Sequence, residues 1–301
     1  MNAVRNAYIE LHIAVLLLGL TAILGDLIQL SALSLVWWRV LITSISLLPL
    51  AKINYIRRQL PRKTLKAYMG IGVLVGMHWM AFYGAIKLSN ASIALVCMAT
   101  TSFFTAIIEP ILVKRPFRWY ELALGALIVP GMALIVDGVR IPVFSGLVAG
   151  LLAAFLASLF AILNKSLTGR LDEKSVTFVE LGSAWVFLSA VWLALLATGN
   201  GENVFWPPSI LDWFYLVVLA LLCTTLAYVM ALRTLRHLSA FTSNLTINLE
   251  PVYGIALAWL ILKEGKDLSG NFYWGVGIIL LTIFVHPLLR RYFETDKTAT
   301  R

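Results

Sequence analysis

The chain has 301 residues, of which 60% are hydrophobic and 13% charged, and it carries a formal net charge of +9. Soluble globular domains contain about 25% charged residues and disordered chains are rich in polar ones, so this composition excludes both classes. Since a helix of roughly 20 apolar residues crosses the hydrocarbon layer of a bilayer, the length instead fits a membrane protein with many spans.

Ten apolar windows follow one another along the chain, each long enough for one membrane-spanning helix. In lipid, backbone polar groups must bond internally, so only helices and closed barrels span it, and these windows lack the alternation of barrel strands. The sequence therefore predicts an all-α membrane protein with ten transmembrane helices, in the windows 8–30, 33–50, 68–86, 90–113, 119–137, 144–164, 175–197, 211–235, 237–262 and 271–289.

Lysine and arginine residues concentrate on one side of these windows. The loops on the side of the N-terminus, together with the C-terminal tail, hold nineteen of them, whereas the opposite side holds five, counting Arg39 inside its helix. The positive-inside rule then places both termini in the cytoplasm. These loops explain the net charge without a nucleic-acid partner. For the cluster at 52–66, topology determination is favoured over contact with anionic lipid.

The cysteines and the spaced glycines inside the windows are interpreted as packing residues. Cys97 and Cys223 are the only cysteines, and two cysteines so placed form neither a disulfide framework nor a Cys-x-x-Cys metal site. No metal site and no cofactor are therefore expected. Gly72 and Gly76 stand four residues apart, a spacing that lets helices approach closely.

The chain repeats itself weakly at an offset of 150 residues. Residues 91–114 read ASIALVCMATTSFFTAIIEPILVK and residues 241–264 read FTSNLTINLEPVYGIALAWLILKE, and span lengths and loop positions coincide as well. Because the repeat unit contains five spans, an odd number, the second copy crosses the membrane in the opposite direction. Such inverted repeats are typical of alternating-access transporters, with the substrate site near the midplane between the halves.

The segment 248–264, NLEPVYGIALAWLILKE, carries the most specific motif. Pro251 and Glu264 stand thirteen residues apart and Gly275 follows eleven residues later, as in the EamA-type transporters of the drug/metabolite transporter (DMT) superfamily. The chain resembles this family over nearly its whole length. The first half departs from the motif, with Lys114 in place of the glutamate.

This resemblance implies a first EamA-like five-helix repeat over residues 1–137, a second over 144–289 and a cytoplasmic tail over 290–301. It also implies a secondary transporter, an exporter or exchanger, that moves small metabolites such as amino acids or amphipathic amines across the bacterial inner membrane. The expected partners are a small-molecule substrate and the lipid bilayer. Proton coupling is a further expectation, and both a monomer and a dimer suit the architecture.

Ionisable side chains inside the windows are candidates for the transport pathway, since they are costly in lipid and usually face a cavity or each other. Glu250 lies near the centre of the ninth window, and Pro251 beside it removes a helix hydrogen bond and is expected to kink the helix. A buried carboxyl at this depth is suited to bind and release a proton. The alternative is a packing role, in which Glu250 bonds to donors such as Asn248 or Asn244.

Arg39 lies in the outer part of the second window. Because a guanidinium keeps its charge, it needs an acid, water or a substrate carboxylate. A pair with Glu250 is one interpretation, and snorkelling to the outer headgroups beside an aromatic belt of Trp37 and Trp38 is the other. Glu180 is the counterpart of Arg39 in the second half, and the two are expected to mark opposite ends of one pathway without touching.

His78 lies in the middle of the third window, and its counterpart in the repeat is Tyr228 in the eighth. With Trp79 they predict a polar centre with aromatic walls, which can hold a cation or stack on a planar substrate. A packing role for a lone histidine is the alternative. The predicted substrate or proton pathway therefore comprises Glu250, Arg39, His78, Glu180, Tyr228, Asn248 and Trp79, with Pro251 as the helix kink.

Catalytic signatures are absent from the sequence, which contains no His-Glu-x-x-His, no phosphate-binding Gly-rich loop and no Gly-x-Ser-x-Gly. The chain is therefore not expected to be an enzyme. The alternative is a membrane-embedded enzyme or lipid-modifying protein in which Glu250, Glu180 and His78 meet as acid and base. A third interpretation is an exchanger of phosphorylated metabolites. It requires several lysines or arginines in the cavity, and only Arg39 qualifies.

Overall fold

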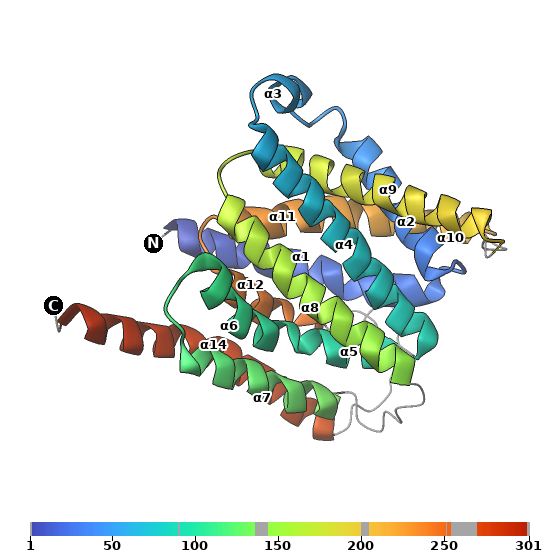
Figure 1. The fold of residues 1–301 in the computed structure, drawn as a ribbon. Coiled ribbons are helices and arrows are strands. Elements are labelled where there is room, and N and C mark those ends of the chain that lie inside the picture. Colours follow the sequence, from blue (N-terminus) through green and yellow to red (C-terminus); the bar gives the residue numbers. More distant parts are fainter. Residues whose placement is uncertain are drawn as a thin grey trace.

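The computed structural model describes residues 2–89, 91–135, 144–199, 205–250, 252–253 and 270–299, and the regular structure in these ranges is helical (Figure 1). The elements are α1 (Asn2–Leu27), α2 (Ala32–Leu47), α3 (Ile53–Arg58), α4 (Arg62–Leu88), α5 (Ala91–Ala99), α6 (Thr101–Val113), α7 (Trp119–Ile135), α8 (Phe144–Leu167), α9 (Glu173–Ala197), α10 (Ile210–Ala220), η1 (Leu221–Leu226), α11 (Ala227–Thr234), α12 (Ala240–Ile247) and α14 (Gly270–Ala299).

Among the described residues, seven helices are long and apolar enough to cross a membrane. They fall on Ala3–Leu27, Arg62–Leu88, Ala94–Val113, Phe144–Leu167, Glu173–Ala197, Ile210–Thr234 and Tyr273–Phe293. Two shorter apolar helices, Ala32–Leu47 and Trp119–Leu134, coincide with the second and fifth predicted windows. Of the ninth window, 237–262, the structure describes α12 and a few residues after it, so the rest of that predicted span lies outside the described residues.

Polar residues at fixed positions start several of these helices. Ser31, Asp172, Ser209 and Ser239 precede α2, α9, α10 and α12, and each accepts a hydrogen bond from the backbone N–H three residues later. This N-cap satisfies a donor that the first helical turn leaves unpaired.

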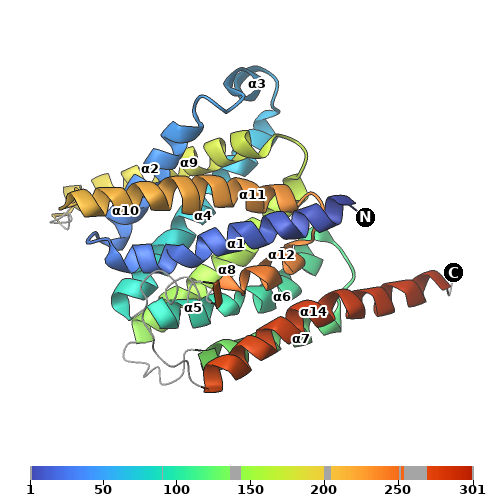
Figure 2. The same cartoon turned by 180° about the vertical axis from the view of Figure 1, so that it is seen from behind.

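Helix contacts recur in corresponding pairs in the two parts of the chain. In the first, α4 packs against α8 and α9. In the second, the run from α10 to α11, which corresponds to α4, packs against α1 and α2. The helices α7 and α14 pack against each other, as do α2 and α9. Figure 1 shows α1 and α8 running in opposite directions, and both termini lie at one end of the molecule (Figure 2).

Gly72 lets α4 and α9 come into backbone contact. A Cβ atom at this position would lie 2.0 Å from the carbonyl oxygen of Glu180, whereas at Gly70, two residues earlier, nothing lies within 4 Å. The close approach fits the predicted packing role of Gly72. It also fixes the position of Glu180 on α9.

Replacing Gly72 with alanine is therefore expected to force α4 and α9 apart and to cost about 1–3 kcal/mol of stability, as overpacking of a filled interior does. Gly70→Ala is the matched control on the same helix, since its added methyl group meets open space. Thermal unfolding in detergent measures both variants. Equal midpoints for the two would contradict the backbone contact.

Candidate functional site

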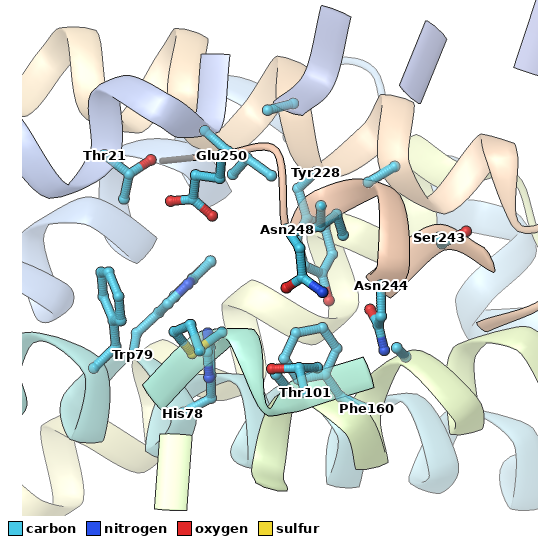
Figure 3. A pocket seen from close by; sticks show the side chains of 18 of the residues that line it. Thr21, His78, Trp79, Thr101, Phe160, Tyr228, Ser243, Asn244, Asn248 and Glu250 are labelled. Atoms are coloured by element: carbon cyan, nitrogen blue, oxygen red, sulfur yellow. The ribbon is translucent and has the colours of Figure 1, made fainter. Parts of the chain in front are cut away.

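A cavity lies where the first and second parts of the chain meet, with about 1130 Å³ of empty space that includes the open space at its mouth. It is called the central cavity here, and α1, α2 and α4 to α7 line it together with α8, α11 and α12. Most of its wall is apolar or aromatic. The polar side chains that line it are Thr21, Arg39, His78, Thr101, Asn164, Tyr228, Ser243, Asn244, Asn248 and Glu250 (Figure 3).

Most of the predicted pathway residues come together at this cavity. Glu180 lies behind its wall in contact with the lining residue Tyr228, and Pro251, the predicted kink, lies outside the described residues. The other predicted residues line the cavity directly, and these are Arg39, His78, Trp79, Tyr228, Asn248 and Glu250. Whether they carry substrate or protons stays a prediction.

Arg39 on α2 is fully buried and held by three hydrogen bonds. Its Nε donates to Thr224 Oγ1 at 2.5 Å, its Nη1 to the Tyr83 hydroxyl at 2.8 Å and its Nη2 to the Cys223 carbonyl at 3.5 Å. Its Cζ atom also lies 4.1 Å from the centroid of the Trp79 ring, which is cation–π geometry. The guanidinium is thus fixed against α4 and η1.

This burial overturns the snorkelling interpretation of Arg39, because a headgroup-seeking side chain keeps its charged end in water. The tryptophans beside it bond and pack within the protein. Trp38 donates from Nε1 to the Phe205 carbonyl at 2.9 Å, and its ring centroid lies 5.0 Å from that of Trp213. Trp37 donates to Ser189 Oγ at 2.8 Å. Phe205, shortly before α10, packs against the rings of both Trp37 and Trp38, which hydropathy alone does not reveal.

The groups that hold Arg39 come from a widened turn of the helix. In η1, Thr224 Oγ1 donates to the Leu219 carbonyl at 2.7 Å and Thr225 Oγ1 to the Ala220 carbonyl at 2.9 Å, each five residues earlier. A π-helical turn of this kind is frequent at functional sites. It presents the Thr224 hydroxyl and the Cys223 carbonyl to Arg39. Sequence reasoning missed this turn, and the adjacent threonines are its one visible signal.

Glu250 and Arg39 line the same cavity, which was the condition for their predicted pairing. Among the described residues, however, the guanidinium is bound by Thr224, Tyr83 and Cys223 rather than by the Glu250 carboxylate. Figure 3 shows the Glu250 carboxylate directed into the open space, on the opposite side from His78. A cation and a carboxylate therefore face one cavity without neutralising each other by direct contact.

Glu250 also does not bond to the asparagines that the packing interpretation offered it. Asn248 donates from Nδ2 to Ser102 Oγ at 2.7 Å, and Asn244 donates to Thr105 Oγ1 at 2.8 Å. The two bonds join α12 and the residue that follows it to α6. The asparagines therefore hold the helix that precedes Glu250 in place. Because neither of them bonds to Glu250, its carboxylate stays directed into the cavity.

Glu180 is a fully buried carboxyl on α9. Its Oε2 atom accepts hydrogen bonds from the Tyr228 hydroxyl at 2.6 Å and from Asn164 Nδ2 at 3.4 Å, while its Oε1 atom has no hydrogen-bond partner among the described residues. The hydrogen bonds that Arg39 makes go elsewhere, as expected for residues that do not touch. Tyr228 links Glu180 to the central cavity.

His78 on α4 is oriented by the backbone of α8. Its Nδ1 atom lies 2.8 Å from the Ala153 carbonyl, which only accepts, so Nδ1 carries the proton in this bond. Its ring stands 5.3 Å from that of Phe160, centroid to centroid, in a T-shaped arrangement. The neutral ring then has Nε2 as its acceptor, in a wall of aromatic residues.

Three hydroxyl oxygens that line the cavity were not predicted. The oxygens of Thr21, Thr101 and Ser243 are buried and have no hydrogen-bond partner among the described residues. Unpaired buried polar atoms are costly and rare, so a solute or water that enters the cavity is expected to bind them. Thr21 is a lone hydroxyl in an apolar window, whereas Thr101 and Ser243 have other hydroxyl-bearing residues beside them, so the sequence singled out at most Thr21.

The comparisons with known proteins bear on the whole chain. The model of the EamA-like transporter family matches residues 6–137 and again residues 144–286. A solved crystal structure superposes with a TM-score of 0.75 at 17% sequence identity, covering 96% of this chain and 99% of the other, and this likeness shows the fold alone. No protein with a curated description matches the chain.

Proposed function

Because the chain belongs to the EamA-like transporter family, we propose that it is a secondary transporter of small metabolites. It acts as an exporter or exchanger of amino acids or amphipathic amines in the bacterial inner membrane. Membership of the family indicates a transporter rather than an enzyme, and the apolar helices indicate a multi-pass membrane protein. One observation carries the proposal: both parts of the chain line a single cavity with unpaired polar groups.

The proposed architecture is ten transmembrane helices in two inverted five-helix repeats, with both termini in the cytoplasm. Three observations support it. The family model matches the chain twice. The helix contacts recur in corresponding pairs, and corresponding helices such as α1 and α8 run in opposite directions (Figure 1). Rocking of one repeat against the other would then expose the cavity alternately to each side.

The charges in the cavity support a substrate with an ammonium group, alone or with a carboxylate. Glu250 offers a carboxylate to the ammonium group. Arg39 has more N–H donors than its three bonds use, so it can still bind a substrate carboxylate. Trp79 and Tyr228 supply aromatic faces for the apolar part of an amine or amino acid. Of the described lining residues Arg39 is the only lysine or arginine, which disfavours phosphorylated metabolites.

The membrane-embedded enzyme is disfavoured by where its proposed acid and base groups bond. His78 donates to the Ala153 carbonyl, and Glu180 accepts from Tyr228 and Asn164. None of these three bonds joins His78 or Glu180 to the other or to Glu250. General acid–base catalysis needs such groups within hydrogen-bond reach of one reacting atom.

Transport is tested with the purified full chain in proteoliposomes, with an imposed pH gradient and a panel of labelled amino acids and amines. We expect movement of at least one panel member that stops when a protonophore collapses the gradient. Protein-free liposomes measure leakage. The proposal would be overturned if folded and correctly inserted protein moved no panel member faster than the leakage rate.

A further inference from the structure

A second hollow lies between α4 and α9, apart from the central cavity. It is an open groove with about 1000 Å³ of empty space, and its walls come from Leu65, Met69 and Val73 on α4 and from Phe178, Val186 and Phe187 on α9. Met69 and Val186 are 46% and 61% exposed, so the groove opens on the surroundings of the bundle. In a membrane protein, the surroundings of such an apolar groove are lipid.

Glycines deepen this groove. Nothing lies within 4 Å of the position that a Cβ atom would take at Gly70, and the nearest atom at Gly182 is Ser44 Oγ at 4.0 Å. Both glycines line the groove. They leave room for an aliphatic chain laid along the helices.

Cations stand at one end of the same two helix faces. Arg62 and Lys66 precede Met69 on α4 at intervals of three or four residues, which places them on one face of the helix. On α9, Lys174 precedes Phe178 by one turn. All three cations are exposed, and none forms an ion pair with a residue in the described ranges.

The loop that contains α3 adds to this basic rim. The backbone N–H of Lys52 donates to Ser175 Oγ at 2.8 Å, and its ammonium group lies 3.5 Å from Asp172 Oδ1. These contacts hold the loop beside the start of α9. The loop carries Arg57 and Arg58, both exposed.

We propose that this groove and its basic rim form a binding site for an anionic phospholipid of the leaflet on the cation-rich side. An acyl chain lies along the groove, and the phosphate binds between Arg62 and Lys66 on one side and Lys174 on the other. Basic pockets between membrane helices bind anionic headgroups in this way. The proposal is independent of transport and goes beyond it.

A second copy of the chain fits this surface poorly. In a two-fold symmetric dimer the same patch is present on both subunits. If the groove lay at such an interface, the two basic rims would meet at the same depth of the membrane and repel each other. An anionic amphiphile complements both the apolar groove and the charge of the rim.

The test measures retained lipid by native mass spectrometry, on the full chain purified from micelles with equal phosphatidylglycerol and phosphatidylcholine. Gly70→Phe places a ring at the groove, where nothing lies within 4 Å of the Cβ position. Gly84→Phe is its matched control, since the Cβ position there also has nothing within 4 Å and lies outside the groove. A double variant, Lys66→Gln with Lys174→Gln, removes two cations of the rim. Its control is the double variant Arg5→Gln with Lys114→Gln, which removes two positive charges outside the rim.

We expect the wild type to retain phosphatidylglycerol over phosphatidylcholine. Retention falls about fivefold for each rim cation removed and is lost in Gly70→Phe, whereas both controls behave as the wild type. Equal retention by Gly70→Phe and Gly84→Phe would overturn the proposal. Equal losses of lipid in the two charge variants would also overturn it, since they indicate diffuse electrostatic attraction. A changed oligomeric state in Gly70→Phe with unchanged lipid would overturn it too, since it indicates that a second copy of the chain occupies the groove.

Discussion

Replacing Arg39 with methionine is expected to reduce movement of any carboxylate-bearing substrate in proteoliposomes by roughly a hundredfold, since a hydrogen bond to a charged group contributes about 3 kcal/mol at most. The guanidinium is fully buried and held by Thr224, Tyr83 and Cys223. No other described lining residue is a lysine or an arginine, so none can replace its positive charge. Uptake against substrate concentration is the measurement.

The stability of this variant is expected to fall as well, by about 1–3 kcal/mol, because the hydroxyls of Tyr83 and Thr224 lose a buried partner. Uptake is therefore normalised to the amount of folded, inserted protein. Tyr83→Phe is the control, because it removes one hydrogen bond to Arg39 and leaves the charge in place. Wild-type uptake of carboxylates by the methionine variant would show that Arg39 does not contact the substrate.

Seven of the ten predicted windows fall on described helices that are long and apolar enough to cross a membrane, because hydropathy identifies a span from the length and composition of the segment alone. The windows 144–164 and 175–197, for example, coincide closely with α8 and α9. The sequence also singled out the buried charges, since an arginine or glutamate in an apolar window is conspicuous. Arg39 and Glu250 were found in this way, and both line the central cavity.

The hydrogen-bond partners of the buried charged side chains could not be predicted from the sequence. The bond from Arg39 to Thr224 joins residues 185 positions apart, and the bond from Tyr228 to Glu180 joins residues 48 apart. Periodicity predicts which side chains share one face of a helix, but not which face meets which neighbour. The π-helical turn of η1 shifts that register again, and no hydropathy pattern predicts it.

The close approach of α4 to α9 connects the packing of the helices with the candidate site. Gly72 places the backbone of α4 against the carbonyl of Glu180, and the Glu180 side chain then accepts from Tyr228. On the outer side of the same helix pair, Gly70 and Gly182 open the lipid-facing groove. Gly70 and Gly72, two residues apart on one helix, thus have opposite roles. Gly72 allows backbone contact with α9, and Gly70 leaves the groove open.

Replacing Glu250 with glutamine is expected to reduce accumulation driven by a pH gradient at least about tenfold. Exchange of substrate for substrate continues at a higher half-saturating concentration, because the amide oxygen still accepts a hydrogen bond from the substrate ammonium group. A glutamine stays neutral at every pH, as a protonated carboxyl is, but it cannot release a proton. Glu250 lines the central cavity on the helix run that Asn244 and Asn248 hold against α6. Transport cycles that need no net proton movement therefore still occur.

The matched control for this variant is a buried carboxyl away from the cavity. Glu109 is 2% exposed and bonds to Arg115 at 3.0 Å and to the backbone N–H of Phe241 at 3.1 Å. Transport by the wild type and by Glu109→Gln should depend on pH in the same way, because both keep Glu250, and a proton carrier must be ionised in one half of the cycle and protonated in the other. The exchange that Glu250→Gln retains should not depend on pH. If its pH dependence equals that of the wild type, Glu250 does not carry the proton.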